Sequence, residues 1–303
     1  MRIVAILNRD GGTLRSLDVE EFGERACRTF EEAGHACSVR VVSGGDLVEA
    51  LEEAAADDGT DAILAGGGDG TISAAAAVLA GTDKALAVLP AGTMNLFARG
   101  LGIPLDIDDA IPALAGGTVR AVDVASANGE TFIHQFSIGM HPTVLHERSR
   151  LTFASRIGKM FASMRAAVTT LWRPPRLRVE LETPDARMKA VTSSIGVTNN
   201  LFGEGHLPYA EMPDRGVLGI YVTRARSRGD MLVFLLNLAI GRWRKNEQVD
   251  IHETDRVLLT ILSHGRRFKC SLDGELRDLA KETELRIHPG ALKVLVPVAE
   301  DAA

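Results

Sequence analysis

Four glycines surround one aspartate in a short segment of the N-terminal half, which reads Gly66-Gly67-Gly68-Asp69-Gly70-Thr71. It lies between an apolar run typical of a buried strand and a run with helical spacing. Glycines let a ligand approach the backbone closely, and the following helix offers unpaired N–H groups at the positive end of its dipole. The segment therefore predicts a cradle for an anion, most often phosphate. It is neither a P-loop nor a Rossmann fingerprint, because the Gly-Lys-Ser/Thr ending and the G-x-G-x-x-G spacing are missing.

A second loop of the same kind follows the next expected strand and reads Leu89-Pro90-Ala91-Gly92-Thr93-Met94-Asn95. Thr93 and Asn95 place a hydroxyl and an amide beside another helix N-terminus. Taken alone, a Pro-Gly turn that caps a helix explains this segment equally well. Together with the first loop at a neighbouring strand end, it predicts a grip on the phosphates of one nucleotide.

The third motif lies far away in the sequence and reads Leu272-Asp273-Gly274-Glu275. One of its carboxylates could act as a general base towards a hydroxyl, while the other orients that hydroxyl or holds a metal. Asp-Gly is also a very common hairpin turn, so the motif alone leaves both interpretations open.

The first 125 residues alternate short apolar strands with helical runs, which predicts βαβ units around a parallel sheet. Ligands bind such sheets at the carboxyl ends of the strands, where the glycine-rich loops lie. After Asp123 the expected strands follow one another through turns, which favours an antiparallel β-sandwich or barrel. These strands are expected at 131–138, 176–183, 189–198, 217–223, 257–262, 267–272 and 284–288, with helical insertions at 152–171 and 231–243.

We therefore expect an α/β domain at 1–125, a β domain at 126–290, and a C-terminal segment at 291–303 that returns to the first domain.

Composition and charge narrow the class of protein. The 303 residues are 46% hydrophobic and 24% charged, as is ordinary for a globular protein, and the net charge of −6 argues against nucleic acid as a partner. Cys27, Cys37 and Cys270 are odd in number and form no C-x-x-C pair, which indicates buried thiols in a reducing compartment. The apolar N-terminus is too short for a secretory signal, and residues 231–240 are too few to span a bilayer. We expect a cytoplasmic protein.

One stretch favours contact with the inner membrane surface. Residues 148–178 contain no acidic residue, and their basic residues are interleaved with Phe153, Phe161 and Trp172. A basic amphipathic segment with aromatic residues suits an anionic membrane. A helix that packs on the β domain with one solvated face gives the same pattern, so both interpretations stay open.

The order of the three motifs resembles the diacylglycerol kinase/sphingosine kinase superfamily, and is most similar to its bacterial soluble lipid kinases. The likeness extends over nearly the whole chain. The resemblance implies an N-terminal α/β domain, a C-terminal β-sandwich and a nucleotide cleft between them. It also implies ATP as phosphoryl donor, Mg²⁺ as cofactor and a lipid alcohol such as diacylglycerol as acceptor, with no oligomeric state specified.

The resemblance also implies roles for individual residues. Glu275 would be the general base for the lipid hydroxyl, with Asp273 beside it. Asp69, Asp123 and Asp214 would organise magnesium. The nucleotide would be bound by Asn8, Gly66, Gly67, Gly68, Asp69, Gly70, Thr71, Gly92, Thr93 and Asn95.

Several positions depart from the family pattern. Leu96 follows Asn95 where the family has an aspartate, so one carboxylate of the metal network is missing. Arg9 follows Asn8 where the family has proline, and its guanidinium could contact phosphate. Arg215 follows Asp214 in the family's structural magnesium loop, and arginine cannot ligate magnesium. His134 and His141 stand where the family often has Asn and Asp, and either local hydrogen bonding or substrate contact explains them.

Three functions remain open on this evidence. The ordered motifs favour an ATP-dependent lipid kinase. An NAD kinase shares the Gly-Gly-Asp-Gly-Thr loop, although Gly92-Thr93-x-Asn95 and Asp273-Gly274-Glu275 are typical of the lipid branch. The changes at Leu96 and Arg215 are compatible with a nucleotide-binding pseudokinase that senses lipid without phosphorylating it.

Overall fold

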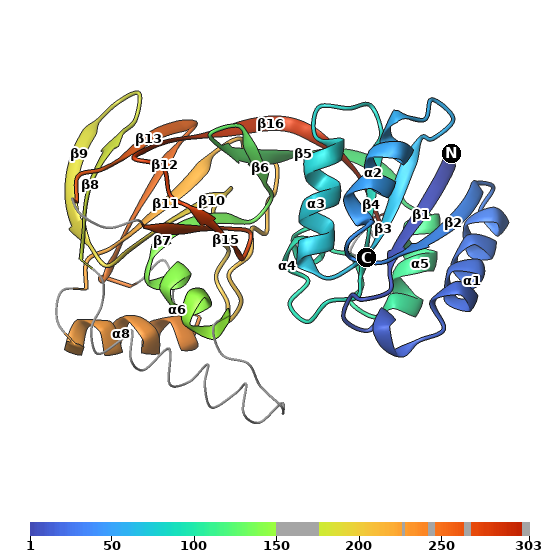
Figure 1. The fold of residues 1–303 in the computed structure, drawn as a ribbon, viewed down its shortest axis with the longest axis horizontal. Helices are drawn as coiled ribbons and strands as arrows, with labels where there is room; N and C mark the ends of the chain where they lie inside the picture. The colour runs from blue at the N-terminus through green and yellow to red at the C-terminus, as the bar shows by residue number, and fades with distance from the viewer. Residues whose placement is uncertain (150–175, 226–227, 242–245, 264–267, 299–303) are drawn as a thin grey trace, which may run out of the picture. The chain divides into compact units, whose positions relative to one another are not determined.

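The computed structural model describes residues 1–149, 176–225, 228–241, 246–263 and 268–298 (Figure 1). The chain divides into two compact units: unit 1 comprises Met1–Val124, Tyr209–Gly216 and His288–Ala303, and unit 2 comprises Ala125–Pro208 and Val217–Ile287. The helix expected at 152–171, and with it most of the basic stretch 148–178, lies outside the described residues. The domain boundaries taken from the sequence stay predictions.

Unit 1 is built on a parallel sheet with the strand order β2-β1-β3-β4, continued by the C-terminal part of β16. Helix α1 packs with α5 and α2 with α3, so that helices cover both faces of the sheet (Figure 1). Strands β3 and β4 are buried along their whole length, as is usual for central strands of a parallel sheet. The α/β fold expected for this part is confirmed. Its elements are β1 (Arg2–Asn8), η1 (Leu14–Ser16), α1 (Val19–Glu32), β2 (Ala36–Val42), α2 (Leu47–Ala56), β3 (Ala62–Gly67), α3 (Asp69–Leu79), β4 (Ala85–Pro90), α4 (Leu96–Gly100), α5 (Ile107–Ala115) and most of β5 (Thr118–Ala127).

The strand order places a topological switch point between β1 and β3. From β1 the chain passes to β2 on one side of it, and then to β3 on the other side. In open sheets of this kind, ligands bind outside the carboxyl ends of the strands at the point where the order reverses. The loops that begin at Asn8 and at Gly66 lie at that point.

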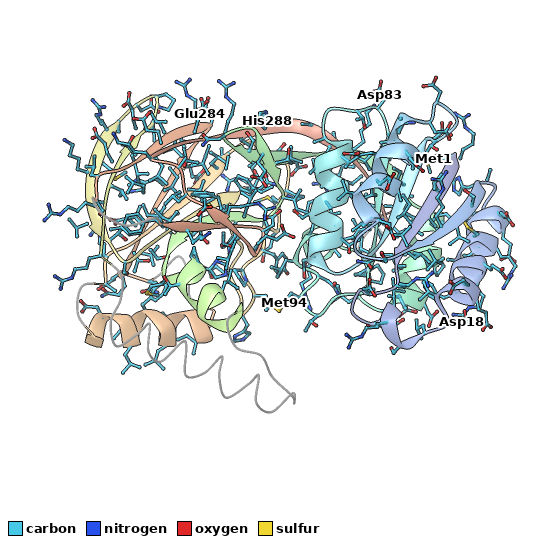
Figure 2. All side chains as sticks on the ribbon, viewed as in Figure 1. Met1, Asp18, Asp83, Met94, Glu284 and His288 are labelled. Atoms are coloured by element: carbon cyan, nitrogen blue, oxygen red, sulfur yellow. A yellow bond between two sulfur atoms is a disulfide. The ribbon has the colours of Figure 1, made fainter. Side chains whose placement is uncertain are left out.

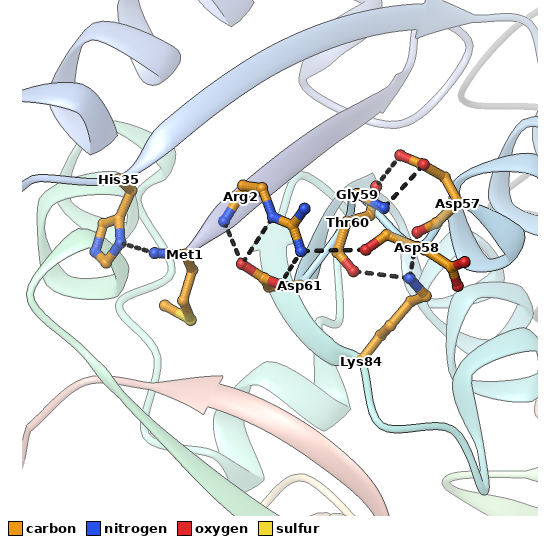
Figure 3. Close-up of polar contacts among 9 residues, drawn as sticks. All are labelled: Met1, Arg2, His35, Asp57, Asp58, Gly59, Thr60, Asp61 and Lys84. Atoms are coloured by element: carbon orange, nitrogen blue, oxygen red, sulfur yellow. Dashed lines mark hydrogen bonds and ion pairs between the residues drawn. The ribbon is translucent and has the colours of Figure 1, made fainter.

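Ion pairs and hydrogen bonds hold the amino ends of the strands, at the end of the sheet opposite the glycine loops. Lys293 of β16 (Glu282–Val296) pairs with Asp83, which precedes β4. Asp83 is labelled in Figure 2. Arg2 pairs with Asp61 at 2.8 Å, at the start of β1 and β3 (Figure 3). The Arg2 hydrogen bonds lower the pKa of Asp61 to about 2. Lys84 donates to the backbone oxygens of Asp57 and Thr60, and in this way closes the turn before β3. These contacts fix the amino ends of the strands and leave the carboxyl ends to the glycine loops.

A disulfide joins Cys27 of α1 to Cys37 of β2, with the two Cα atoms 5.1 Å apart. The interpretation of these two cysteines as free thiols is therefore wrong. Helix α1 packs on β2, which follows it after a short turn, and this packing brings the two positions together. Cys270 is buried and free, as expected, and its burial raises the pKa of the thiol.

Unit 2 is an antiparallel β-sandwich, as expected. One sheet contains β13, β8, β9 and the first part of β16, with β5 and β6 at its side. The other sheet has the order β12-β11-β10-β7-β14-β15, and its pairings are antiparallel. Apolar side chains from both sheets form a shared core that includes Phe132, Phe136, Leu181, Ile220 and Leu285. The elements are β6 (Glu130–Phe132), β7 (Gln135–Gly139), α6 (Met140–Ser149), β8 (Leu177–Glu182), β9 (Arg187–Thr192), β10 (Ser194–Asn199), β11 (Leu218–Thr223), α8 (Arg228–Ala239), β12 (Val249–Thr254), β13 (Arg256–Ile261), β14 (Lys269–Leu272), β15 (Glu275–Asp278) and the first residues of β16.

Some strands differ from the expected ones. The single strand expected at 189–198 is two strands, β9 and β10, which lie in different sheets. Strands β12 and β15 were not expected from the sequence. None of the helices in the described part of the chain is long and apolar enough to cross a membrane.

Replacing Cys37 with alanine tests the contribution of the disulfide to stability. Closing a loop of this length in the unfolded chain should be worth about 2–3 kcal/mol. We expect Cys37→Ala to lower the free energy of unfolding by about that amount in a denaturant titration. Reductant should destabilise the wild type and the control Cys270→Ala, but not Cys37→Ala. Equal sensitivity of the wild type and Cys37→Ala to reductant would contradict the assignment.

Candidate functional site

Three loops pack against one another at the carboxyl ends of β1, β3 and β4. We call residues 8–13, 66–71 and 90–96 the glycine-loop site. The Thr13 N–H donates to the Ala91 oxygen at 2.7 Å, and the Ala91 N–H donates to the Gly67 oxygen at 3.0 Å. Backbone hydrogen bonds thus connect the loop after β4 to each of the other two. The structure brings together the two glycine-rich segments and Asn8, as the sequence predicts for a nucleotide site.

The glycines permit this close packing. A Cβ atom on Gly92 would lie 2.8 Å from the Cα of Gly68, so the two loop backbones touch directly. A Cβ on Gly67 would lie 2.4 Å from the Thr71 hydroxyl oxygen. A side chain at Gly92 would force the two loops apart, and one at Gly67 would displace Thr71 within its own loop.

The N-terminus of α3 is open to a ligand. Gly68 is its N-cap residue, and no side chain caps the helix. The first N–H groups of an α-helix have no partner within the helix and carry the positive end of its dipole. Gly70, in the first turn, is exposed. This arrangement can bind the oxygens of a phosphate group.

Asp69 and Asn95 fix the shape of the second loop. The Asp69 carboxylate accepts the N–H of Asn95 at 3.1 Å and of Leu96 at 2.8 Å, and thereby caps α4. Asn95 has a left-handed backbone with φ of 49°, and its side chain accepts the Gly92 N–H at 2.9 Å. Its amide donates to the oxygens of Pro90 and Gly92. Both side chains therefore hold backbone, and Thr93 stays exposed at the tip of the loop.

Asn8 is buried under the first loop. Its amide donates to the Thr71 hydroxyl at 3.0 Å, and its oxygen accepts the N–H of Asp10. Asp10 in turn accepts the Gly44 N–H at 2.8 Å, and so connects the loop after β1 to the loop after β2. Asp10 was not predicted as a site residue, although an acidic residue directly before two glycines is a signal in the sequence. Arg9 pairs with Glu20 at the surface.

The predicted metal residues contact other groups of the protein. The Asp123 carboxylate is only 2% exposed and accepts the N–H of Gly216 at 2.7 Å and of Gly290 at 2.9 Å. Asp214 pairs with Arg120 at 2.6 Å. Over the described ranges, no three His, Cys, Asp or Glu side chains are grouped so that they could hold a metal ion. These residues therefore do not form a metal site of protein ligands alone, and their assignment to magnesium stays a prediction.

The Asp-Gly motif of unit 2 forms the two-residue turn between β14 and β15. Asp273 and Gly274 have φ of 45° and 89°, as a type I′ hairpin turn requires. The Asp273 carboxylate accepts the N–H groups of Ile133, His134 and Gln135, each at 2.9 Å. Asp273 therefore fixes the start of β7 against this turn.

Glu275, the predicted base, is at the end of the same turn. Its side chain is 58% exposed and pairs with Arg277 at 2.8 Å. Arg277 also pairs with Glu130 at 3.0 Å, and its bonds to both carboxylates raise the pKa of the guanidinium. Of the two carboxylates in the motif, the one predicted as base is accessible, whereas the other is committed to backbone amides.

A pocket of about 350 Å³ lies in unit 2, on the face of the six-stranded sheet that points away from the sandwich core. Its floor is made of alternate residues of β7, β10 and β11, and its walls come from α6, α8 and the chain after β10. The floor residues are Gln135, Ser137, Ser194, Gly196, Thr198, Tyr221 and Thr223, and the walls include Met140, His141, Phe202, Pro208 and Phe234. The size is that of a small-molecule site.

Hydrogen bonds and ring stacking order this pocket. The buried Ser137 hydroxyl lies 2.8 Å from Nδ1 of His141, and burial lowers the pKa of that histidine. The Phe202 ring stacks between His134 and Tyr221, with centroid distances of 5.2 and 5.4 Å. His141 thus forms a local hydrogen bond and also lines the pocket.

This pocket was not predicted from the sequence. Its signal is the alternation in β7 and β10 of core residues with small or polar ones, such as Ser137, Gly196 and Thr198. The same alternation is typical of a strand with one solvated face. Only the packing of α6 and α8 over that face distinguishes the two cases.

Comparison with known proteins identifies the family. Residues 2–127 match the diacylglycerol kinase catalytic domain, and residues 137–296 match the YegS C-terminal NAD kinase beta sandwich-like domain. The chain belongs to the diacylglycerol kinase family. Within this family it is 31% identical over 275 residues to a probable YegS-like lipid kinase of Pseudomonas aeruginosa, covering 88% of this chain and 86% of the relative.

Two further relatives are named diacylglycerol kinases. The protein of Bacillus subtilis is 26% identical, with 81% of each chain covered, and that of Mycobacterium tuberculosis is 27% identical, with 84% of each covered. The fold is similar to a crystal structure of a putative diacylglycerol kinase from Bacillus anthracis, with a TM-score of 0.77, 20% identity and 98% of each chain covered. Membership in this family makes the chain a homologue of lipid kinases.

Proposed function

We propose that this protein transfers the γ-phosphoryl group of ATP to the hydroxyl of a lipid such as diacylglycerol. The glycine-loop site carries the proposal: three interlocked loops at the switch point of a parallel sheet, beside a helix N-terminus that no side chain caps. An anion-binding site in this place suits the triphosphate of a nucleotide.

The donor is held mainly by backbone. The N–H groups at the start of α3 bind phosphate oxygens, and Thr93 adds a hydroxyl from the tip of the second loop. Asp69, Asn95 and Asn8 keep these groups in place through their own hydrogen bonds. Phosphoryl transfer requires mostly positioning and charge neutralisation, which rigid loops supply.

The acceptor occupies the pocket of unit 2. Its walls include Met140, Phe202 and Phe234, which suit an acyl chain, while hydroxyl groups of the floor suit the polar part of a lipid. We propose that the lipid hydroxyl then meets Glu275. Glu275 takes the proton as the lipid oxygen bonds to the γ-phosphorus and the bond from that phosphorus to the departing ADP oxygen breaks.

The ion pair between Glu275 and Arg277 does not prevent this role. Both side chains are largely exposed, at 58% and 44%, and exposed ion pairs are worth only about 0–1 kcal/mol. Arg277 retains Glu130 as a partner when Glu275 turns to the substrate.

We propose that magnesium enters bound to the phosphates of ATP. Hard cations prefer phosphate and carboxylate oxygens. Asp69 is the predicted metal carboxylate that lies within the glycine-loop site, so it would face such an ion, whereas Asp214 is paired with Arg120 and Asp123 holds the amides of Gly216 and Gly290. The proton transfer and bond exchange described above use no metal site built from the protein.

One observation favours a second function. Asp69, Asp123 and Asp273 all hold backbone amides, and the other two predicted catalytic and metal carboxylates, Glu275 and Asp214, lie in exposed ion pairs with arginines. Each of these carboxylates thus has a structural contact of its own. A lipid-sensing pseudokinase would also need only the loops and the pocket.

A phosphotransfer assay with diacylglycerol in mixed micelles separates the two functions. We expect the wild type to transfer label from γ-labelled ATP. Glu275→Gln should reduce turnover about 100-fold or more while ATP binding stays nearly unchanged, because the base does not hold the nucleotide. Asp69→Ala should lose both turnover and ATP binding.

The matched control is Glu130→Gln, since Glu130 pairs with the same Arg277 and has a similar exposure of 52%. It should keep its activity. ATP binding by the wild type without transfer to any lipid alcohol would favour the pseudokinase. Equal loss of ATP binding in Glu275→Gln and Asp69→Ala would remove Glu275 from the role of base.

Filling the pocket tests the acceptor site. Gly196 lines the pocket, and a Cβ atom on it would meet no atom within 4 Å, so there is room to add a side chain at this position. We expect Gly196→Leu to raise the KM for long-chain diacylglycerol about tenfold or more and to leave the KM for ATP unchanged. The lipid KM of Gly196→Ala should lie between those of the wild type and Gly196→Leu. Val191→Leu, at an exposed position of β9, should leave the lipid KM unchanged. An unchanged lipid KM in Gly196→Leu would exclude the pocket.

A further inference from the structure

Helix α8 and the residue that directly follows it, Ile240, expose apolar side chains along one stripe. Leu232, Val233, Leu236 and Ile240 are 55%, 48%, 56% and 53% exposed. Residues 232, 236 and 240 are one turn apart, and residue 233 lies beside them, so the four form a continuous ridge. We call these four residues the α8 ridge. Burying such side chains is favourable, so leaving four neighbouring ones in water is unfavourable.

One polar side chain of the same helix, that of Asn237, is turned towards the protein. The Asn237 amide donates to the side-chain oxygen of Asn246, which is 3% exposed, at 3.3 Å. Asn246 also donates to the backbone oxygen of Phe234, whose side chain lines the pocket. Polar residues of a surface helix normally face water and apolar ones face the protein. In α8 an amide faces the protein and the ridge faces outward, which indicates that the medium outside the ridge is apolar.

The sequence around α8 carries positive charge on both sides. Residues 224–245 contain six basic residues (Arg224, Arg226, Arg228, Arg242, Arg244 and Lys245) and one acidic residue, Asp230, for a net charge of +5 in a chain whose total is −6. An apolar helix between basic residues complements an anionic bilayer surface, where lysine and arginine meet lipid phosphates.

We propose that the α8 ridge is a membrane-docking surface, which lies in the interface of an anionic bilayer with its four side chains among the acyl chains. Helix α8 has 12 residues and does not span a bilayer, so it lies along the surface. Phe234 on the same helix lines the pocket, and α6 contributes Met140 and His141 to it. Docking thus brings a wall of the pocket to the lipid phase. The delivery of lipid from the bilayer to the pocket rests on the proposed function, whereas the docking of the α8 ridge on the membrane does not.

Vesicle sedimentation with the full chain tests the docking. The probes are vesicles of phosphatidylcholine with one third phosphatidylglycerol, and vesicles of phosphatidylcholine alone. We expect the wild type to bind the anionic vesicles, and the double variant Leu232→Ser/Leu236→Ser to bind them about tenfold more weakly. The matched control is Val48→Ser/Val191→Ser, which removes two apolar side chains of similar exposure, 48% and 55%, outside α8. It should bind as the wild type does.

Several outcomes would overturn the proposal. Unchanged binding in Leu232→Ser/Leu236→Ser would show that the ridge is not the contact. Equal binding of the wild type to both kinds of vesicle would show that docking does not depend on anionic lipid, and would contradict the proposed anionic bilayer. A wild-type dimer in sedimentation equilibrium that the double variant abolishes, with no vesicle binding, would assign the ridge to a second copy of the chain.

Dioctanoylglycerol, which is soluble, separates this proposal from the proposed function. The double variant should phosphorylate it as fast as the wild type, but should phosphorylate diacylglycerol in anionic vesicles about tenfold more slowly. Vesicle binding that depends on the ridge, in a protein that phosphorylates neither substrate, would support the docking and contradict the kinase.

Discussion

The contact between two loop backbones, at Gly68 and Gly92, is the constraint on which the candidate site depends. With a Cβ at Gly92 only 2.8 Å from the other loop, the loops after β3 and β4 can pack only without side chains at this point. The Asp69 carboxylate then bridges them by accepting two amides of the second loop. As a result the start of α3 keeps a fixed position beside the switch point of the sheet, and its N–H groups can bind phosphate without prior rearrangement.

Two other aspartates also hold backbone segments together by accepting several amide N–H groups. Asp273 accepts three amides at the start of β7, and Asp123 accepts two amides from segments that lie 93 and 167 residues away in sequence. A carboxylate that accepts several backbone N–H groups holds those segments of backbone in fixed positions. In this protein such carboxylates determine the conformation of the loops around the functional groups. Under the proposed function, the chemistry is left to backbone amides, to Glu275 and to the substrates themselves.

The sequence predicted the elements that depend on local patterns. Alternating apolar runs and glycine loops were sufficient for the α/β unit, and the succession of short strands for the sandwich. Contacts between distant residues could not be predicted in this way. The Arg120–Asp214 pair joins residues 94 apart, and the disulfide depends on how α1 packs on β2. The pocket depends on two helices that cover what otherwise resembles a solvated strand face, with Ser137 and Thr198 on it.

The central claim, that backbone amides of the glycine loops hold the triphosphate, is tested most directly by hydrogen–deuterium exchange of the full chain with and without ATP. We predict that ATP slows exchange at the amides of residues 68–71 and 92–94, while exchange at the amino ends of β1 and β3, near Arg2 and Asp61, is unchanged. Saturating ATP that leaves the exchange at residues 68–71 as it was would contradict the account.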